Sequence, residues 1–262
     1  MSLINYNNVD VYQGESLILK DVNFHVDEGE FLYIIGRVGS GKSSLLKTVY
    51  CELDIYDDKE EQQAEVLGRN LITLKRREIP ALRKEMGIIF QDFKLLHDRN
   101  VRKNLEFVLR STGWKDKKEI TERIESVLQD VGMLDKIDKL PHELSGGEQQ
   151  RIAIARAILN KPKMIIADEP TGALDSQNTS DVLGILSDIA KSGKTVIVVT
   201  HSQEVADYGT RIVHLADAKS LRMNGLNHLM RLSRKRGNLK PKHFLSGLRH
   251  VSLGSISLTT GS

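Results

Sequence analysis

The stretch Gly36-Arg37-Val38-Gly39-Ser40-Gly41-Lys42-Ser43 decides the fold, because it fits the phosphate-loop pattern G-x-x-x-x-G-K-[ST]. An unbroken apolar run, Phe31–Ile35, precedes it, and a stretch of helical composition follows. Backbone N–H groups of such a loop point at phosphate oxygens, and the helix N-terminus adds positive potential. We expect Lys42 to contact the β and γ phosphates and Ser43 to bind Mg²⁺. The predicted phosphate-binding residues are Gly36, Arg37, Val38, Gly39, Ser40, Gly41, Lys42, Ser43 and Ser44.

A second apolar stretch, residues 164–167, ends in the carboxylates Asp168 and Glu169. Strand ends place side chains at the crevice of an open α/β sheet, where ligands bind. We therefore predict that Asp168 holds the Mg²⁺ shell and that Glu169 polarises an attacking water.

The rest of the chain alternates between strand-like and helical stretches. Residues 94–150 are dense in charge, and an apolar stripe at helical spacing runs through residues 119–131. The flanking stretches contain the expected strands, so the pattern favours a largely parallel, covered sheet. We predict an α/β fold, a P-loop NTPase (RecA-like) core with a helical subdomain inserted at about 94–150. The expected strands are residues 5–12, 21–26, 31–35, 86–90, 164–167 and 195–200, and the expected helices include 42–49 and 180–190.

Composition is that of a globular protein, with 40% hydrophobic and 28% charged residues among 262. We expect no signal peptide, and the longest apolar runs fall far short of the roughly 18–20 residues that cross a bilayer. Any membrane role should therefore come through a partner. Residues 218–262 carry nine Lys or Arg and no Asp or Glu, which leaves the preceding 217 residues with a net charge of −6.

The segment Leu144-Ser145-Gly146-Gly147-Glu148-Gln149-Gln150-Arg151 narrows the assignment. It resembles the LSGGQ-type signature of ATP-binding-cassette (ABC) proteins, with Glu148 where many members carry Gln. The resemblance implies an ABC ATPase fold, in which Ser145, Gly146, Gly147 and Glu148 complete the nucleotide pocket of the opposite subunit. A helix beginning at Ser145 would make such an anion site from backbone N–H groups.

Other landmarks of the family follow in order over residues 1–217. Gln91 resembles the glutamine that contacts Mg²⁺ and senses the partner, Asp175 the aspartate of the loop that crosses the dimer interface, and His201 the histidine that binds the γ-phosphate. Tyr12 resembles the aromatic that stacks on adenine, although Tyr6 competes for that role. The predicted catalytic residues are thus Glu169, His201 and Gln91, and the predicted metal ligands are Ser43, Gln91 and Asp168.

The family resemblance implies ATP hydrolysis with ATP and Mg²⁺ in a two-fold symmetric homodimer, in which each ATP is held between two chains. A cassette ATPase of DNA repair or translation would need coiled-coil arms, paired cysteines or a second cassette, and the chain has a single cysteine. We therefore expect no specific nucleic-acid partner. An inactive regulatory module is disfavoured because Lys42, Asp168, Glu169 and His201 are all present.

Two stretches, residues 90–96 and 98–104, resemble the FtsE subfamily of cell-division ATPases. That likeness implies an FtsX-like membrane permease as partner, an effect on peptidoglycan hydrolases, and a location on the cytoplasmic, inner face of the membrane. Lipoprotein-release and macrolide-export ATPases are the alternative, since residues 168–175, 202–206 and 211–213 fit them equally well. We expect residues 92–99 to set partner specificity.

Residues 218–262 depart from the family pattern and form a basic C-terminal extension. One interpretation is a polybasic segment held at an anionic membrane surface. The other is a disordered extension without an essential role. The sequence leaves both open.

Overall fold

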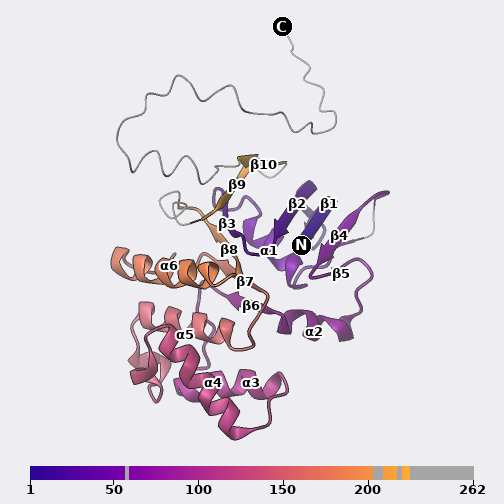
Figure 1. Cartoon of the computed structure of the whole chain (residues 1–262). Coiled ribbons are helices and arrows are strands. Elements are labelled where there is room, and N and C mark those ends of the chain that lie inside the picture. The colour runs from indigo at the N-terminus through magenta and orange to yellow at the C-terminus, as the bar shows by residue number, and fades with distance from the viewer. Residues whose placement is uncertain (57–58, 203–208, 217–219, 225–262) are drawn as a thin grey trace. The chain divides into compact units, whose positions relative to one another are not determined.

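The computed structural model describes residues 1–56, 59–202, 209–216 and 220–224. The described residues form two sheets and a set of helices within the compact unit Met1–Leu226 (Figure 1). The strands are β1 (Ser2–Gln13), β2 (Ser16–Asp27), β3 (Phe31–Ile35), β4 (Gln63–Val66), β5 (Arg69–Asn70), β6 (Met86–Ile89), β7 (Met164–Asp168), β8 (Thr195–Thr200), β9 (Arg211–Ala216) and β10 (Ser220–Asn224).

The helices interleave with these strands. They are α1 (Lys42–Val49), α2 (Ile79–Lys84), α3 (Val101–Ser111), α4 (Lys117–Asp130), α5 (Gly146–Ile158) and α6 (Ser176–Lys191), with short 3-10 turns η1 (Arg76–Glu78), η2 (Leu134–Lys136) and η3 (Pro141–Glu143). The predicted helix at 42–49 and the predicted strands at 31–35 and 195–200 are confirmed to the residue.

The six-stranded sheet has the order β10-β9-β3-β8-β7-β6 and positions the site. Neighbouring strands from β9 to β6 are parallel, and β10 pairs antiparallel with β9. Along β3, Phe31, Tyr33 and Ile35 face one hydrophobic core, while Leu32 and Ile34 face the other. Burial on both faces explains why this strand is apolar without alternation. The predicted parallel, covered sheet is confirmed.

A separate antiparallel sheet with the order β2-β1-β4-β5 packs on the second of these cores. Its strands alternate between buried and exposed positions, as in β2, where Val22, Phe24 and Val26 are buried. The parallel sheet expected from the sequence is therefore only one of two.

Helices α3, α4 and α5 lie together beyond the β6 edge of the parallel sheet (Figure 1). Side chains of Asn100 and Asp116 accept backbone N–H groups at the starts of α3 and α4, as N-caps do. The apolar stripe of α4 is buried at Ile120, Ile124 and Val127. Helix α5 continues past residue 150, where the sequence placed the end of the helical part, to Ile158.

Strand β10 falls inside the stretch that the sequence assigned to the basic extension. Residues 225–262 of that extension, and most of residues 202–206, lie outside the described residues. The division of the chain at residue 217 stays a prediction.

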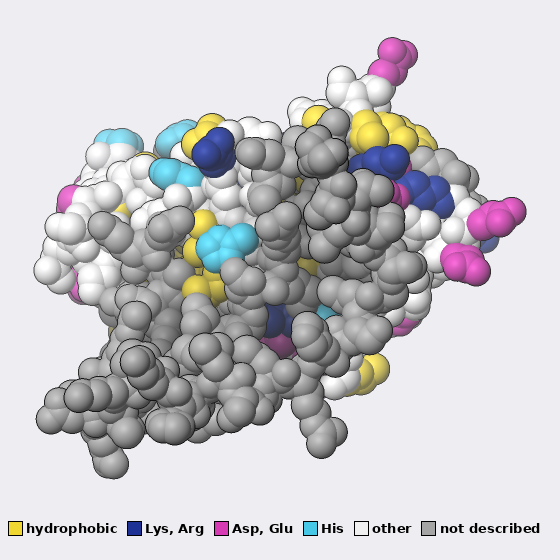
Figure 2. Space-filling model, turned by 90° about the horizontal axis from the view of Figure 1, so that it is seen from above, with side chains coloured by type: hydrophobic (Ala, Val, Ile, Leu, Met, Phe, Trp, Pro, Cys, Tyr) yellow, Lys and Arg dark blue, Asp and Glu magenta, His cyan; other side chains and the backbone are white. Residues whose placement is uncertain are grey.

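In the described part of the chain, no helix is both long and apolar enough to span a membrane. Viewed from above (Figure 2), the described surface carries hydrophobic, basic, acidic and histidine side chains interspersed with one another.

Candidate nucleotide-binding site

The phosphate loop connects β3 to α1. Gly41 caps α1 with a φ of +93°, a left-handed conformation that favours glycine, and a Cβ there would also meet Leu19. The Lys42 side chain is only 5% exposed, and its ammonium donates to the carbonyl oxygens of Gly36 and Arg37, both at 2.8 Å. The loop backbone therefore curves around the lysine and fixes its charge at the N-terminus of α1.

Two oxygen ligands converge beside this loop. The Ser43 hydroxyl donates to Asp168 Oδ1 at 2.9 Å, which joins the first turn of α1 to the end of β7. Burial raises the pKa of Asp168, and the Ser43 hydrogen bond and the Lys42 charge oppose this effect. A hydroxyl and a half-buried carboxylate in contact are the donor set that Mg²⁺ prefers, so these residues fit the metal.

Glu169 lies between the lysine and the histidine predicted from the sequence. Its Oε1 is 3.9 Å from Lys42 Nζ, and its Oε2 is 3.0 Å from His201 Nδ1 and accepts the His201 backbone N–H at 3.3 Å. Glu169 has a φ of +47°, a strained conformation of the kind found at functional sites. The ends of β7 and β8 thus bring Glu169 and His201 together, with Lys42 beside them.

Gln91 lies near this arrangement, and the two candidate adenine-stacking tyrosines, Tyr12 and Tyr6, differ in their surroundings. A Cβ built on Gly172 would lie 3.4 Å from Gln91 Nε2, so the glutamine amide sits beside the loop that follows Glu169. The ring of Tyr12 meets that of Tyr56 edge-on, with centroids 5.7 Å apart. Tyr6 is buried and its hydroxyl lies 3.1 Å from Thr48 Oγ1. Because Tyr6 is packed in the core, Tyr12 stays the candidate for stacking on a base.

The signature residues form the first turn of α5. Ser145 is exposed and caps the helix, since its Oγ accepts the Glu148 N–H at 3.3 Å. In return Glu148 Oε2 accepts the Ser145 N–H at 2.8 Å, which completes a capping box. The Ser145 side chain also hydrogen-bonds the Glu148 carboxylate, so its hydroxyl takes part in both contacts of this turn.

The Asp175 loop packs against this turn. Asp175 caps α6 by accepting the backbone N–H and the side-chain amide of Asn178, at 2.9 and 2.8 Å. A Cβ added to Gly147 would lie 2.0 Å from Asn178 Oδ1, so only glycine fits there. Asn178 therefore links Asp175 to the signature turn of the same chain, and sequence reasoning missed it because polar residues at a helix start commonly serve only as caps.

Arg156 on α5 is a second residue that the sequence did not indicate. Phe93 and Lys94, just after Gln91, both have positive φ, and the Arg156 guanidinium donates to their carbonyl oxygens at 2.8 and 2.5 Å. A Cβ on Gly146 would lie 3.9 Å from the Phe93 ring. The signature turn thus contacts the segments after Gln91 and before Asp175.

Comparison with known proteins places this geometry in a family. The sequence profile described as ABC transporter matches residues 19–172. The chain is 39% identical over 208 residues to the cell division ATP-binding protein FtsE of Streptococcus pneumoniae, covering 79% of this chain and 88% of that protein. It is 37% identical over 213 residues to the macrolide export ATP-binding/permease protein MacB of Shewanella sp. strain ANA-3, covering 81% of this chain and 32% of that protein.

Solved structures of an ABC transporter cassette have the same fold as this chain. The dimeric structure of MJ0796, a bacterial ABC transporter cassette, superposes with a TM-score of 0.74 at 35% identity, over 85% of this chain and all of that one. The same cassette in a post-hydrolysis dimer bound to ADP and Pi gives a TM-score of 0.73 at 34% identity, with the same coverage. The chain therefore belongs to the ABC transporter family, and it is an ABC-type ATPase with a P-loop NTPase fold.

Proposed function

We propose that this ABC ATPase acts as a homodimer, in which each ATP lies between the phosphate loop of one chain and the signature turn of the other. One observation carries the proposal. The signature turn presents the exposed Ser145 at the start of α5, and the atoms nearest to a Cβ on Gly146 or Gly147 belong to Phe93, Leu174 and Asn178, none of which lies in the phosphate loop. The dimeric state of the MJ0796 cassette supports this arrangement.

The residues at the ends of β7 and β8 would carry the hydrolysis. A water molecule attacks the γ-phosphorus, the bond to the bridging oxygen breaks, and ADP and inorganic phosphate leave. Glu169 orients this water and takes its proton, while Lys42 and His201 hydrogen-bond the phosphates. Ser43, Asp168 and Gln91 would hold Mg²⁺, which neutralises charge on the phosphates.

The remaining predicted residues bind and sense the nucleotide. The glycine-rich backbone from Gly36 to Gly41 supplies N–H donors to the phosphates. Tyr12 stacks on adenine, and Tyr56 at its edge limits the positions that its ring adopts. Asp175 lies beside the signature turn, and we expect its position to respond when the second chain binds.

A variant that slows the chemistry tests this proposal. Glu169→Gln should bind ATP, lose turnover and accumulate as a dimer, because ATP that is not hydrolysed keeps the contacts that hold the two chains together. Glu119→Gln, on the exposed side of α4, is the matched control and should keep turnover and the monomer–dimer exchange of the parent. A Glu169→Gln chain that stays monomeric with saturating ATP, by sedimentation velocity, contradicts the composite site.

For the biological role, we propose an FtsE-like function in cell division, in which the dimer drives an FtsX-like permease from the cytoplasmic face of the membrane. The likeness of residues 90–96 to that subfamily and the FtsE relative support it. Macrolide export or lipoprotein release is the second candidate, and the MacB relative supports it.

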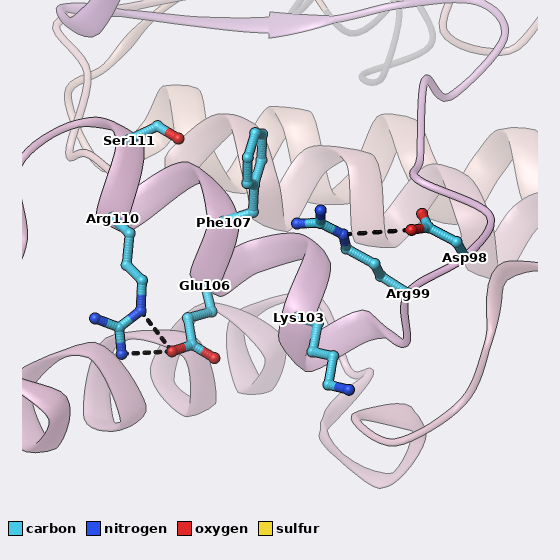
Figure 3. A pocket seen from close by; sticks show the side chains of 7 residues that line it. All are labelled: Asp98, Arg99, Lys103, Glu106, Phe107, Arg110 and Ser111. Atoms are coloured by element: carbon cyan, nitrogen blue, oxygen red, sulfur yellow. Dashed lines mark hydrogen bonds and ion pairs between the residues drawn. The ribbon is translucent and has the colours of Figure 1, made fainter.

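The partner would dock on α3 and the segment before it. A hollow of about 640 Å³ there is lined by Asp98, Arg99, Lys103, Glu106, Phe107, Arg110 and Ser111 (Figure 3). The Phe107 ring is 47% exposed, and the Arg99 guanidinium lies 5.0 Å from its centroid. An exposed aromatic beside cations fits a short amphipathic helix that carries an apolar and an acidic residue.

Co-expression with candidate permeases distinguishes the two roles. An FtsX-like protein should co-purify with the wild-type chain, and Phe107→Ser should reduce its recovery about ten-fold, while Leu134→Ser at a comparably exposed apolar site should not. Recovery of a lipoprotein-release or macrolide-export permease instead supports the second candidate. Recovery that Phe107→Ser leaves unchanged rules out the α3 surface.

A further inference from the structure

Glu148 places a negative charge at the turn that, under the proposed function, receives the other chain's phosphates. Its carboxylate accepts the Ser145 backbone N–H at 2.8 Å, so it occupies one donor of the anion site. A phosphate oxygen bound by the Ser145 hydroxyl would be separated from this carboxylate by two hydrogen bonds and the span from Ser145 Oγ to its backbone N, roughly 8–9 Å at most. Like charges at that distance repel each other, so Glu148 opposes the approach of ATP unless a cation offsets it.

Lys136 is placed to provide that offset. Its Nζ is 3.6 Å from Glu148 Oε1, and the two side chains are 35% and 22% exposed. The lysine comes from η2, which precedes the signature turn in sequence, and it also lies 3.4 Å from the outward-facing Asp135. Arg151, one turn further along α5, is the other cation that acts on the Glu148 carboxylate.

We propose that Lys136 is a positioning residue of the composite nucleotide site, which neutralises Glu148 and so lets the ATP of a second chain dock against residues 145–148. The inference rests on the proposed function, because it concerns the signature half of that site. It has a specific consequence: Lys136 matters only while residue 148 is a glutamate. A glutamine at 148 would complete the same capping box without the charge, and Lys136 would then have nothing to neutralise.

The experiment measures the ATP concentration that gives half-maximal dimer, by sedimentation velocity, in full-length chains that all carry Glu169→Gln. Lys136→Met should raise this concentration about three- to ten-fold, because both sites of the two-fold dimer lose the ion pair. Adding Glu148→Gln to Lys136→Met should bring the value back to within about two-fold of Glu148→Gln alone. The Lys136→Met defect should also shrink as salt is raised, which a purely structural defect would not do.

Lys118→Met is the control, because it removes an ion pair of similar length, with Glu122, on the exposed side of α4. It should leave the half-maximal concentration within about two-fold of the parent. A Lys136→Met chain that dimerises like the parent overturns the inference, and so does a double variant as impaired as Lys136→Met. If the Glu169→Gln parent itself does not dimerise, the proposed function fails and the inference falls with it.

Discussion

The phosphate-loop half and the signature half of the site differ in how far their polar groups are satisfied within one chain. Lys42 is 5% exposed and donates hydrogen bonds to two backbone carbonyl oxygens, and the Ser43 hydroxyl donates to the Asp168 carboxylate. Ser145, by contrast, is exposed, and it hydrogen-bonds Glu148 of the same helical turn. The first half is built into the core of the ATPase, and the second lies on a surface where we propose that another copy of the chain binds.

The largest expected effect comes from breaking the core half. Lys42→Ala removes the charge that faces the phosphates, and turnover should fall about 10³-fold with a large loss of ATP affinity. ATPase rates and fluorescent-nucleotide titration measure both. Lys47→Ala, in the last turn of the same helix, should change neither by more than about two-fold, since Lys47 pairs with Glu52 at the surface. Equal losses in both variants would mean that the charge of α1, not the position of Lys42, matters.

Breaking the surface half should separate binding from turnover. Ser145→Arg places a bulky cation where the second chain must approach, so turnover should fall about 10²-fold, while the affinity of a single chain for nucleotide stays within about two-fold. Ser180→Arg, exposed on α6, is the control for the added charge. If Ser145→Arg weakens nucleotide binding by the monomer as strongly as Lys42→Ala does, the two halves are not distinct.

A smaller effect should follow from disturbing the packing of the signature turn against the start of α6, which Asp175 caps. Gly147→Ala pushes a Cβ onto Asn178 Oδ1, and we expect it to destabilise the fold by about 1–3 kcal/mol in urea unfolding. Asn178→Ala in the same chain should recover part of that loss, because it removes the amide group but keeps the residue 178 Cβ, which lies 2.9 Å from the added one. Gly184→Ala, where α6 leaves open space, should instead be neutral or stabilising by up to about 1 kcal/mol. A Gly147→Ala chain as stable as Gly184→Ala would show that this contact is absent in solution.

The smallest effect concerns the capping carboxylate of the signature turn. The Ser145 backbone N–H, chiefly, lowers the pKa of Glu148, with Lys136 adding to the effect. A carboxyl whose folded pKa is depressed stabilises the fold above its unfolded pKa and loses that contribution as pH falls through the folded value. Wild type should therefore exceed Glu148→Gln in free energy of unfolding by about 0.5 kcal/mol near pH 7, and the gap should close below about pH 4. A gap independent of pH would assign the difference to packing.

The sequence predicted the core half well because its determinants are local. The apolar run of β3, the glycine loop and the helix that follows it occupy one continuous stretch, and their bounds agree with the structure. The N-cap at Ser145 was equally visible from its neighbours. Local structure set by consecutive residues can therefore be predicted from one sequence.

The remainder depends on contacts between residues far apart in sequence. Asn178 meets Gly147, Arg156 holds Phe93 and Lys94, and Lys136 reaches Glu148, yet none of these pairs has a spacing that marks it. The predicted strands at 5–12 and 21–26 fall within β1 and β2, but the short strands β4 and β5 of the same antiparallel sheet were not predicted, for a related reason. Strand β4 is only Gln63–Val66 and carries a glutamate, so its pairing with β1 and not its composition makes it a strand.

The claim that each active site is shared by two chains is tested most directly by mixing two inactive variants. Lys42→Ala lacks a working phosphate loop but keeps its signature turn, and Ser145→Arg has the opposite defect. In an equimolar mixture, about half of the dimers should be mixed, and one of the two sites in each should combine both intact halves. The account predicts that the mixture recovers about a quarter of wild-type turnover, although neither variant alone is active. A mixture that forms mixed dimers and stays inactive contradicts the composite site.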